Sequence, residues 1–241
     1  MRMFQPQELS GVVVVCGHYG VGKTAFSLAL ARDAAASGKE VTLVDLDVVN
    51  PYFRSSDEGA ELEAAGIRVV SPVYAGPSCN IDMPALTGAV APAIERAQAD
   101  AGRLVVIDVG GDDAGASALG RFSGVIAQGS YRMLYVVNRF RALTQTPAEA
   151  IGVLHDIEDA CRLRATGVVD NSHLMGDTTA ACIEEGARFA CDVARVAGIP
   201  LVAHVVAKRF AKAGEQALAR AGDTAPLYAI APYRQVTWGN E

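Results

Sequence analysis

The sequence predicts an α/β fold, a three-layer sandwich in which helices cover both faces of a mostly parallel β-sheet. Three observations lead to this fold class. Short apolar segments rich in β-branched residues alternate with helical segments along almost the whole chain. A glycine-rich turn at 17–24 joins the first strand to the first helix, and acidic residues end two later strands, at Asp45 and Asp108. Strands that alternate with helices in this way form parallel sheets buried on both faces.

The individual elements follow from periodicity and from residues that interrupt it. Strands are expected at 12–16, 41–44, 67–70, 104–111, 133–137, 166–171, 200–207 and 226–230, and helices at 25–36, 58–65, 84–98, 114–128, 147–161, 178–197 and 209–221. Gly38 and Gly198 end two of these helices, and Pro147 suits the first turn of another. Asp112 and Asp113 are interpreted as N-capping residues of helix 114–128. The order of the strands does not follow from this pattern.

Length and composition favour one globular domain, which we expect to span residues 1–241. The chain has 241 residues, of which 51% are hydrophobic, enough to bury a sizeable core. Its net charge of -6 argues against a protein that holds nucleic acid by overall electrostatic attraction. The apolar run at 12–16 is too short to span a bilayer and leads directly into a glycine-rich turn. We therefore expect a cytoplasmic protein without a membrane segment or signal peptide.

The cysteines and histidines give no sign of a metal site. Five cysteines are present, at 16, 79, 161, 182 and 191, and none forms a C-x-x-C or C-x-C pair. Reduced and mostly buried thiols are expected. His155, His173 and His204 have no metal-ligand spacing among themselves and are interpreted as ordinary histidines.

The segment at 17–24 matches the pattern G-x-x-x-x-G-K-[ST] at every fixed position. Its glycines allow backbone N–H groups to converge on an anion, and the start of the following helix adds its dipole. Lys23 is expected to reach the β- and γ-phosphates of a nucleotide, and the Thr24 hydroxyl to hold Mg²⁺. An ordinary glycine-rich turn is the alternative, and the complete match favours phosphate binding. The residues expected at the nucleotide are Gly17, His18, Tyr19, Gly20, Val21, Gly22, Lys23, Thr24 and Ala25.

Acidic residues end two of the apolar strands. Asp45 and Asp47 stand two positions apart at a strand's end, where both can face the glycine-rich turn, because ligands of open parallel sheets bind at that edge. One of them capping a turn while the other is solvated is the alternative. Asp108 is expected to hold Mg²⁺, usually through water. The Gly111 N–H is expected to sense whether a γ-phosphate is present.

The loop after Asp47 carries Asn50, Pro51, Tyr52, Phe53 and Arg54. Its two aromatic residues either contact a partner or anchor the loop on the core, and the sequence leaves both interpretations open. A basic cluster at Lys208, Arg209 and Lys212 is interpreted as a solvated helix face rather than a DNA-binding patch.

These motifs together resemble the MinD/ParA branch of P-loop ATPases, the CobQ/CobB/MinD/ParA nucleotide-binding fold. The resemblance rests on the 17–24 turn, on Val44-Asp45-Leu46-Asp47, on the D-x-G-G at Asp108 and on Asn171, and it spans roughly residues 11–232 in element order. It implies Mg²⁺ and ATP as cofactors, with Thr24, Asp45 and Asp108 at the metal. It also implies that Lys23 and Asp47 are the catalytic residues, with Asp47 orienting the attacking water.

Asn171 resembles the asparagine that reads adenine near the end of a late strand in this branch, and a turn-forming asparagine is the alternative. ATP is favoured over GTP because the sequence contains no N-K-x-D motif; at Asn138-Arg139-Phe140-Arg141 an arginine stands where the base-reading acid is expected. The tail at 231–241 does not resemble a basic amphipathic membrane helix.

The sequence departs from the partitioning members at His18 and Tyr19, which replace the Lys-Gly pair of K-G-G-x-G-K-T. In those members the first lysine crosses a dimer to the partner's phosphates, and a neutral imidazole cannot supply that constant cation. His18 covers the phosphates within its own subunit, acts as a polar spacer, or replaces the lysine when protonated. Arg54 is a second candidate replacement, and a nucleotide-driven homodimer is left open.

Three functions are compatible with the resemblance. The first is an ATP-hydrolysing switch that turns over slowly without an unidentified protein partner. The second is a small ATP-dependent ligase of the dethiobiotin- or cobyrinate-synthase kind, with the loops at 71–82 and 171–177 around its substrate. The third is a module that binds nucleotide without hydrolysing it. In each case ATP and ADP are the expected ligands, with no membrane or nucleic-acid partner.

Overall fold

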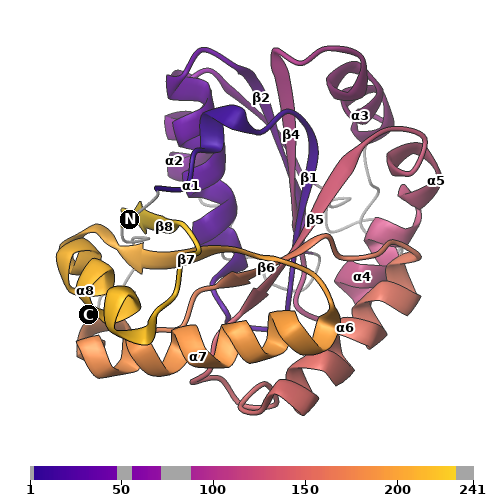
Figure 1. The fold of residues 1–241 in the computed structure, drawn as a ribbon. Helices are drawn as coiled ribbons and strands as arrows, with labels where there is room; N and C mark the ends of the chain where they lie inside the picture. Colours follow the sequence, from indigo (N-terminus) through magenta and orange to yellow (C-terminus); the bar gives the residue numbers. More distant parts are fainter. Residues whose placement is uncertain (1–2, 48–55, 72–87, 232–241) are drawn as a thin grey trace, which may run out of the picture.

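A computed structural model describes residues 3–47, 56–71 and 88–231 of the chain (Figure 1). Its centre is one eight-stranded sheet in the order β3-β2-β4-β1-β5-β6-β7-β8. The strands are β1 (Gly11–Cys16), β2 (Glu40–Leu46), β3 (Ile67–Val70), β4 (Arg103–Val109), β5 (Tyr131–Val137), β6 (Gly167–Asp170), β7 (Leu201–Ala207) and β8 (Leu227–Ile230). Every pair of neighbouring strands within the described part is parallel, which confirms the predicted sheet.

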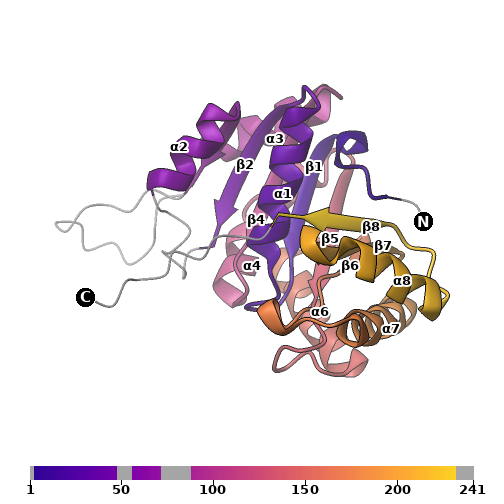
Figure 2. The same ribbon diagram turned by 90° about the vertical axis from the view of Figure 1, so that its left-hand side faces the viewer.

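Helices cover both faces of the sheet. They are α1 (Lys23–Ala36), α2 (Ser56–Ala64), α3 (Val90–Ala99), α4 (Asp113–Gly120), α5 (Ser123–Ile126), α6 (Pro147–Cys161), α7 (Ala180–Ala197) and α8 (Ala211–Ala221). Figure 2 looks onto the face on which α1 lies along the sheet. In β1, Val13 and Val15 pack toward α1, whereas Val12 and Val14 belong to the opposite core with α3, α6 and α7. The continuous apolar run of β1 thus reflects burial on both faces.

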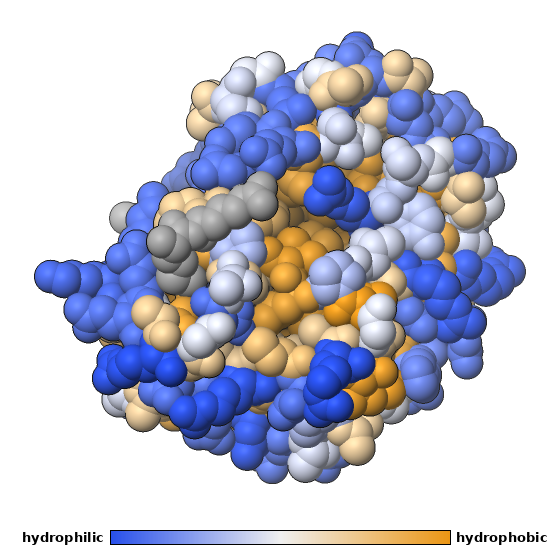
Figure 3. All heavy atoms as spheres, viewed as in Figure 1, coloured by the Kyte–Doolittle hydropathy of each residue, from blue (hydrophilic) through white to orange (hydrophobic). Residues whose placement is uncertain are grey.

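Apolar residues also show at the surface on one side of the molecule. Figure 3 shows hydrophilic residues around the periphery of the face seen in Figure 1, and apolar residues gathered on the floor of a central hollow. In the part of the chain that the structure describes, no helix is both long and apolar enough to cross a membrane.

Several element boundaries differ from the predicted ones. The helix expected at 114–128 is divided into α4 and α5, and the Asp112 side chain caps α4 by accepting a hydrogen bond from the Gly115 N–H at 2.9 Å, while Asp113 is the first residue of the helix. Strand β6 ends at Asp170, so Asn171 lies in the loop after it. A short 3-10 turn, Lys208–Phe210, precedes α8. These differences fall at ends and breaks, where local sequence signals are weakest.

The register of the sheet places the two predicted acidic positions side by side. Asp45 lies in β2 and pairs directly with Asp108 in β4, while β1 lies on the other side of β4. The carboxyl ends of β1, β2 and β4 therefore meet at the edge where the glycine-rich turn leaves β1.

Candidate functional site

The glycine-rich turn connects β1 to α1 and depends on close backbone packing. A Cβ atom on Gly17, whose φ is 147°, would lie 2.4 Å from the carbonyl oxygen of Val136. A Cβ on Gly22, whose φ is 91°, would lie 2.2 Å from the Asn171 amide nitrogen. Gly22 is also the N-cap of α1, so the first N–H groups of the helix begin directly behind the turn. Larger residues at these two positions would displace the turn from its neighbours.

Lys23 is held inside the turn. Its side chain is buried, and its Nζ donates a hydrogen bond to the His18 carbonyl oxygen at 2.9 Å. Burial lowers the pKa of Lys23, while the charges of Asp108 and Asp47 act in the opposite direction. The turn therefore contains a cation placed among backbone groups that suit an anion.

Asp108 lies in a network of hydroxyl groups from the start of α1. The Thr24 hydroxyl donates to Asp108 Oδ2 at 2.7 Å, and the Ser27 hydroxyl donates to Oδ1 at 3.1 Å. Burial raises the pKa of Asp108 to about 6, against the opposing effects of Thr24, Lys23 and Ser27, so the carboxyl group is mostly ionised at pH 7. The Thr24–Asp108 pair was expected from the motifs. Ser27 was not, although it lies one helical turn after Thr24 and hence on the same face of α1.

The second acidic pair lies beside this network. Asp45 is buried, and its Oδ1 accepts a hydrogen bond from the backbone N–H of Asp47 at 2.9 Å. Asp47 itself is partly exposed and lines the cavity described below. The two residues thus have different environments, because one belongs to the buried sheet and the other to the open edge.

The donor set fits a metal ion that is held largely by another molecule. Thr24, Asp45 and Asp108 supply hydroxyl and carboxylate oxygens, which are the ligands that Mg²⁺ prefers. Within residues 3–47, 56–71 and 88–231, no group of three or more His, Cys, Asp or Glu side chains could hold a metal ion.

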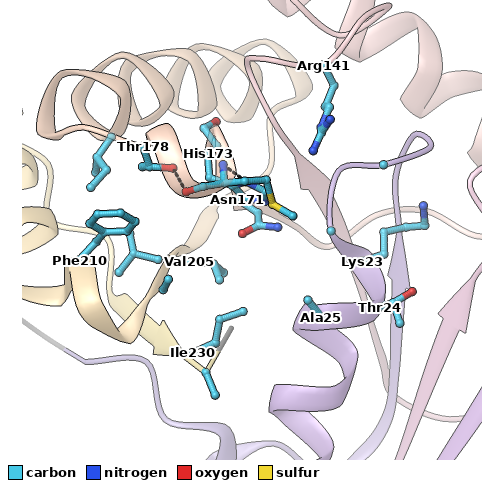
Figure 4. Close-up of a pocket in the computed structure, with 18 of the residues that line it drawn as sticks. Lys23, Thr24, Ala25, Arg141, Asn171, His173, Thr178, Val205, Phe210 and Ile230 are labelled. Atoms are coloured by element: carbon cyan, nitrogen blue, oxygen red, sulfur yellow. Dashed lines mark hydrogen bonds between the residues drawn. The ribbon is translucent and has the colours of Figure 1, made fainter. Parts of the chain in front are cut away.

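A cavity of about 660 Å³ opens beside the turn (Figure 4). Eight of the sequence-predicted residues line it, namely Tyr19, Gly20, Gly22, Lys23, Thr24, Ala25, Asp47 and Asn171. The others, Gly17, His18, Val21, Asp45, Asp108 and Gly111, are not part of its wall. They lie next to it, since Thr24 contacts Asp108 and Val21 contacts Asn171 through hydrogen bonds.

Asn171 links the far side of the cavity to the turn. Its side-chain Nδ2 donates to the Val21 carbonyl oxygen at 2.7 Å, and its backbone N–H donates to the Val137 carbonyl at 2.8 Å. The structure therefore gives this residue a positioning contact that sequence reasoning did not foresee. That Asn171 recognises the adenine base of a nucleotide stays a prediction.

Gly111 approaches the turn from the β4 side. A Cβ atom there would lie 2.6 Å from Tyr19 Cα and 2.9 Å from Lys23 Nζ. Gly111, the second residue after β4, thus lies close against the glycine-rich turn, and a side chain added there would have to displace the turn.

His18 lies at the start of the turn and is partly buried. Burial and the charge of Lys23 both lower the pKa of His18. Even an ordinary histidine is not a constant cation at pH 7, and this shift makes the His18 imidazole a weaker base still. The position occupied by lysine in the partitioning members therefore carries no constant cation in this chain.

The far end of the cavity consists of residues that sequence reasoning did not select. His173, Val205, Phe210 and Ile230 line it, and the Arg209 guanidinium lies 4.7 Å from the centre of the Phe210 ring. Arg209 also donates to the Met175 carbonyl at 3.2 Å, so this member of the basic cluster lies at the cavity and not only on a solvated face. Arg141 enters from the loop after β5. No local signal could identify these residues, because they come from five separate segments.

A buried charged cluster lies behind this end. His204 Nδ1 is 2.8 Å from Asp170 Oδ2, and His204 Nε2 is 3.1 Å from Asp223 Oδ2. Burial alone would lower the pKa of His204, but the two carboxylates more than offset this and raise it to about 9. Interaction with His204 in turn lowers the pKa of Asp223. His204 thus links β6, β7 and the segment after α8 through two carboxylates, a structural role that its place in the sequence does not indicate.

The cysteines within the described part are free thiols. Cys16 and Cys161 are buried, Cys182 is half-buried and Cys191 is exposed. The expected loop with Asn50, Pro51, Tyr52, Phe53 and Arg54, together with Cys79, lies outside the described residues.

The parallel sheet, the turn with its buried lysine and the Thr24–Asp108 pair define a P-loop nucleotide-binding protein, and the turn at 17–24 is its P-loop. The model of the CobQ/CobB/MinD/ParA nucleotide-binding domain family matches residues 12–218. The chain belongs to this family. No curated protein sequence is similar enough to count as a match.

Similar solved structures share the fold at low sequence identity. Chloroplast FtsY from Physcomitrella patens has a TM-score of 0.53 at 14% identity, covering 83% of this chain and 61% of its own. FtsY from Thermotoga maritima has a TM-score of 0.53 at 20% identity, covering 88% of this chain and 66% of its own. The 54 kDa protein of the signal recognition particle from Aeropyrum pernix, in complex with GDP, has a TM-score of 0.50 at 18% identity, covering 81% and 42%. This chain spans less than two thirds of the length of each.

Proposed function

We propose that this protein binds and hydrolyses ATP with Mg²⁺ and acts as a nucleotide-controlled switch. The observation that carries the proposal is the 2.7 Å hydrogen bond between Thr24 and Asp108, directly beside the buried Lys23. A hydroxyl group on the P-loop and a carboxylate on a neighbouring strand are the two protein groups that hold magnesium in P-loop NTPases. Here they are already in contact.

Each residue of this edge has a distinct task in the proposed reaction. Magnesium, held by Thr24 and Asp108 with support from Asp45, neutralises charge on the phosphates when bound. Lys23 binds the β- and γ-phosphates. Asp47 lies at the open edge, where it orients a water molecule for attack. The water oxygen forms a bond to the γ-phosphorus, the bond to the β–γ bridging oxygen breaks with its electron pair left on ADP, and one proton of the water is released.

The switch follows from what adjoins the phosphates. Gly111 lies against the P-loop, so a γ-phosphate that moves the P-loop or draws the Gly111 N–H changes the segment after β4. The segment after Asp47, which lies outside the described residues, is the second one proposed to respond to ATP. A protein partner in the cytoplasm reads this change, and turnover is slow without it. A homodimer is compatible with the proposal, although His18 supplies no constant cation to a partner subunit.

ATP is proposed over GTP because the sequence has no N-K-x-D motif and because Asn171 lies at the cavity wall. Competition between ATP and GTP for the Mg²⁺-loaded protein tests the choice of base directly. Binding of GTP at least as tight as that of ATP would contradict it.

Phosphate release from Mg-ATP tests the proposed activity. Wild type, Lys23→Ala and Asp47→Ala are compared, with the exposed Lys212→Ala as a control for loss of one positive charge. We expect slow release by wild type and Lys212→Ala, and a loss of about 100-fold or more in the other two variants. Asp47→Ala should still bind ATP, because Asp47 is not part of the P-loop.

The same assay distinguishes the two alternatives. It is repeated with cell extract, DNA, lipid and a panel of carboxylate metabolites. Tight ATP binding without phosphate release under all these conditions would show a non-hydrolysing module. Release that requires one metabolite and forms a product from it would show a ligase.

A further inference from the structure

The cavity contains a second cation that the P-loop motif does not include. Arg141 lines the cavity from the loop after β5, and Figure 4 shows its guanidinium extending toward the P-loop. Its Nε lies 3.9 Å from the position that a Cβ atom on Gly20 would occupy. Lys23 Nζ, in contrast, donates to the His18 carbonyl oxygen and lies 2.9 Å from the position that a Cβ atom on Gly111, after β4, would occupy. Arg141 therefore lies beside Gly20, whereas the Lys23 ammonium lies between the P-loop and the segment after β4.

The loop that carries Arg141 is fixed by buried polar residues. The Asn138 side chain is fully buried; it accepts from the Phe140 N–H at 3.0 Å and donates to the His173 carbonyl at 3.4 Å. The Thr144 side chain is also buried and donates to the Asn138 carbonyl at 3.4 Å. The Arg141 N–H donates to the Asn138 carbonyl at 3.2 Å. These bonds hold the backbone of the loop that carries Arg141.

The guanidinium has unused hydrogen-bonding capacity. Its Nε is buried and has no hydrogen-bond partner, and no ion pair involves Arg141 within the described part of the chain. Arg139, two positions earlier, forms an ion pair with Glu185 at 3.3 Å. Arg141 as a whole is half-exposed, but a buried Nε–H without a partner is unfavourable unless a ligand supplies one. Burial lowers the pKa of His173 at the cavity wall, and the charge of Arg141 lowers it further, while Asp170 acts in the opposite direction.

We propose that Arg141 binds the phosphates of the nucleotide in the P-loop, from within the same subunit. The inference rests on the proposed function, which makes that nucleotide ATP. A planar guanidinium can donate two parallel hydrogen bonds to phosphate oxygens, which suits an arginine at the edge of an anion site. Arg141 thereby supplies the constant second cation that His18 does not.

The location of Arg141 beside the P-loop explains why its proposed contact with the phosphates should favour hydrolysis. Negative charge moves onto the β–γ bridging oxygen as the bond to the γ-phosphorus breaks. A fixed guanidinium stabilises that charge without further reorganisation, because its loop is already ordered. Arg141 thus acts as a catalytic residue and not only as a binding residue.

The test compares Arg141→Ala and Arg141→Lys with Arg139→Ala. The control variant removes an equal charge from the same loop but leaves the cavity wall intact. Calorimetry with magnesium measures the affinities for ATP, ADP and adenosine, and phosphate release gives kcat and KM. Thermal unfolding of each variant without ligand establishes that it is folded.

We expect Arg141→Ala to bind Mg-ATP about 10-fold more weakly and to lower kcat about 100-fold. Adenosine affinity should not change, since adenosine has no phosphate. Arg141→Lys should recover part of the ATP affinity, and Arg139→Ala should match wild type. Equal ATP affinity and kcat in Arg141→Ala and wild type would overturn the inference, as would an equal loss for ATP and adenosine, which would place Arg141 at the base or ribose.

The binding measurements separate this inference from the proposed function. If wild type binds Mg-ATP without releasing phosphate, the proposed hydrolysis fails. The phosphate contact is then still decided by the ATP and adenosine affinities of Arg141→Ala.

Discussion

The two ends of the cavity are built in different ways. The phosphate end is built from the eight consecutive residues 17–24 and from acids near the carboxyl ends of β2 and β4, Asp45 and Asp108. Gly17 packs against the Val136 carbonyl, and Gly111 lies against the backbone of Tyr19. The far end combines side chains from the loop after β6, from β7, from the turn before α8 and from β8. It is supported from behind by a buried histidine between two carboxylates.

This contrast separates two kinds of stability. Close backbone contacts at the phosphate end do not titrate, and the pKa of Asp108 beside them is about 6, so this end should change little as the pH rises above 7. The His204 cluster at the far end depends on protonation. The comparison therefore predicts that mutations and pH act differently on the two ends.

The largest effect should come from removing the buried cation. The pKa of His204 rises from 6.5 to about 9 on folding, which corresponds to about 3 kcal/mol of stabilisation. Because the folded-state pKa is the higher one, this stabilisation is complete below pH 6.5 and is lost as pH rises toward 9. Asp170 and Asp223 face the imidazole, and Cys191 contacts Asp223.

Urea unfolding of His204→Gln and wild type between pH 6 and 9 measures how much His204 contributes to the free energy of unfolding. The variant should be less stable by about 3 kcal/mol at pH 6, and the difference should shrink by pH 9. The exposed His155→Gln is the control and should follow wild type. A difference that stays constant over this range would show that packing, and not the ionic cluster, holds the far end.

Next in size is Gly111→Ala at the phosphate end. The new methyl group would meet the Tyr19 backbone at 2.6 Å, so the P-loop must shift. Displacement of this order lowers turnover about 100-fold. Gly152→Ala on α6, where nothing lies within 4 Å of the added atom, is the matched control and should keep wild-type phosphate release. Normal turnover in Gly111→Ala would mean that the P-loop yields at little cost.

Asn171→Ala tests the connection between the ends. It leaves the buried Val21 carbonyl without its donor, which should cost about 1 to 3 kcal/mol of stability and weaken Mg-ATP binding. Gln98→Ala also removes an amide that donates to a backbone carbonyl, that of Ile126 at 2.8 Å, but away from the cavity. Chemical unfolding and calorimetry should show that both variants lose stability and that only Asn171→Ala loses nucleotide affinity.

The smallest effect should come from a helix end that belongs to neither region. The Thr146 hydroxyl caps α6 by accepting a hydrogen bond from the Glu149 N–H at 3.2 Å. The Glu149 carboxylate in turn accepts a hydrogen bond from the Thr146 N–H at 2.9 Å. Thr146→Ala should cost about 1 kcal/mol, measured by thermal unfolding. Its Mg-ATP affinity should equal that of wild type; a reduced affinity would show that α6 contributes to the site after all.

The same contrast explains what the sequence could predict. The P-loop, Asp45 and Asp108 were predictable because their chemistry is contained in short contiguous motifs. The sheet was predictable because buried strands are continuously apolar. Ser27 was within reach, since helical spacing places it on the face of Thr24.

The remaining residues depend on which strands become neighbours. In the sequence, Arg141 served only as evidence against guanine binding. Its place at the cavity could not be predicted, because the pairing of β1 with β5 is what brings its loop to Gly20. His204 stands within an apolar strand, and the carboxylates that charge it lie 34 residues before and 19 residues after it in the chain. The break between α4 and α5 has no strong local signal either.

The central place of β1 has a mechanical consequence. The strand lies between β4 and β5, so its P-loop is flanked by the segment leading to α4 on one side and by the segment leading to α6 on the other. Those two helices meet again at their far ends, where the Arg162 guanidinium donates to the Gly120 carbonyl. Both flanks of the P-loop thus lead into helices that share one junction, and under the proposed switch a protein bound at that junction could respond to the nucleotide without contacting it.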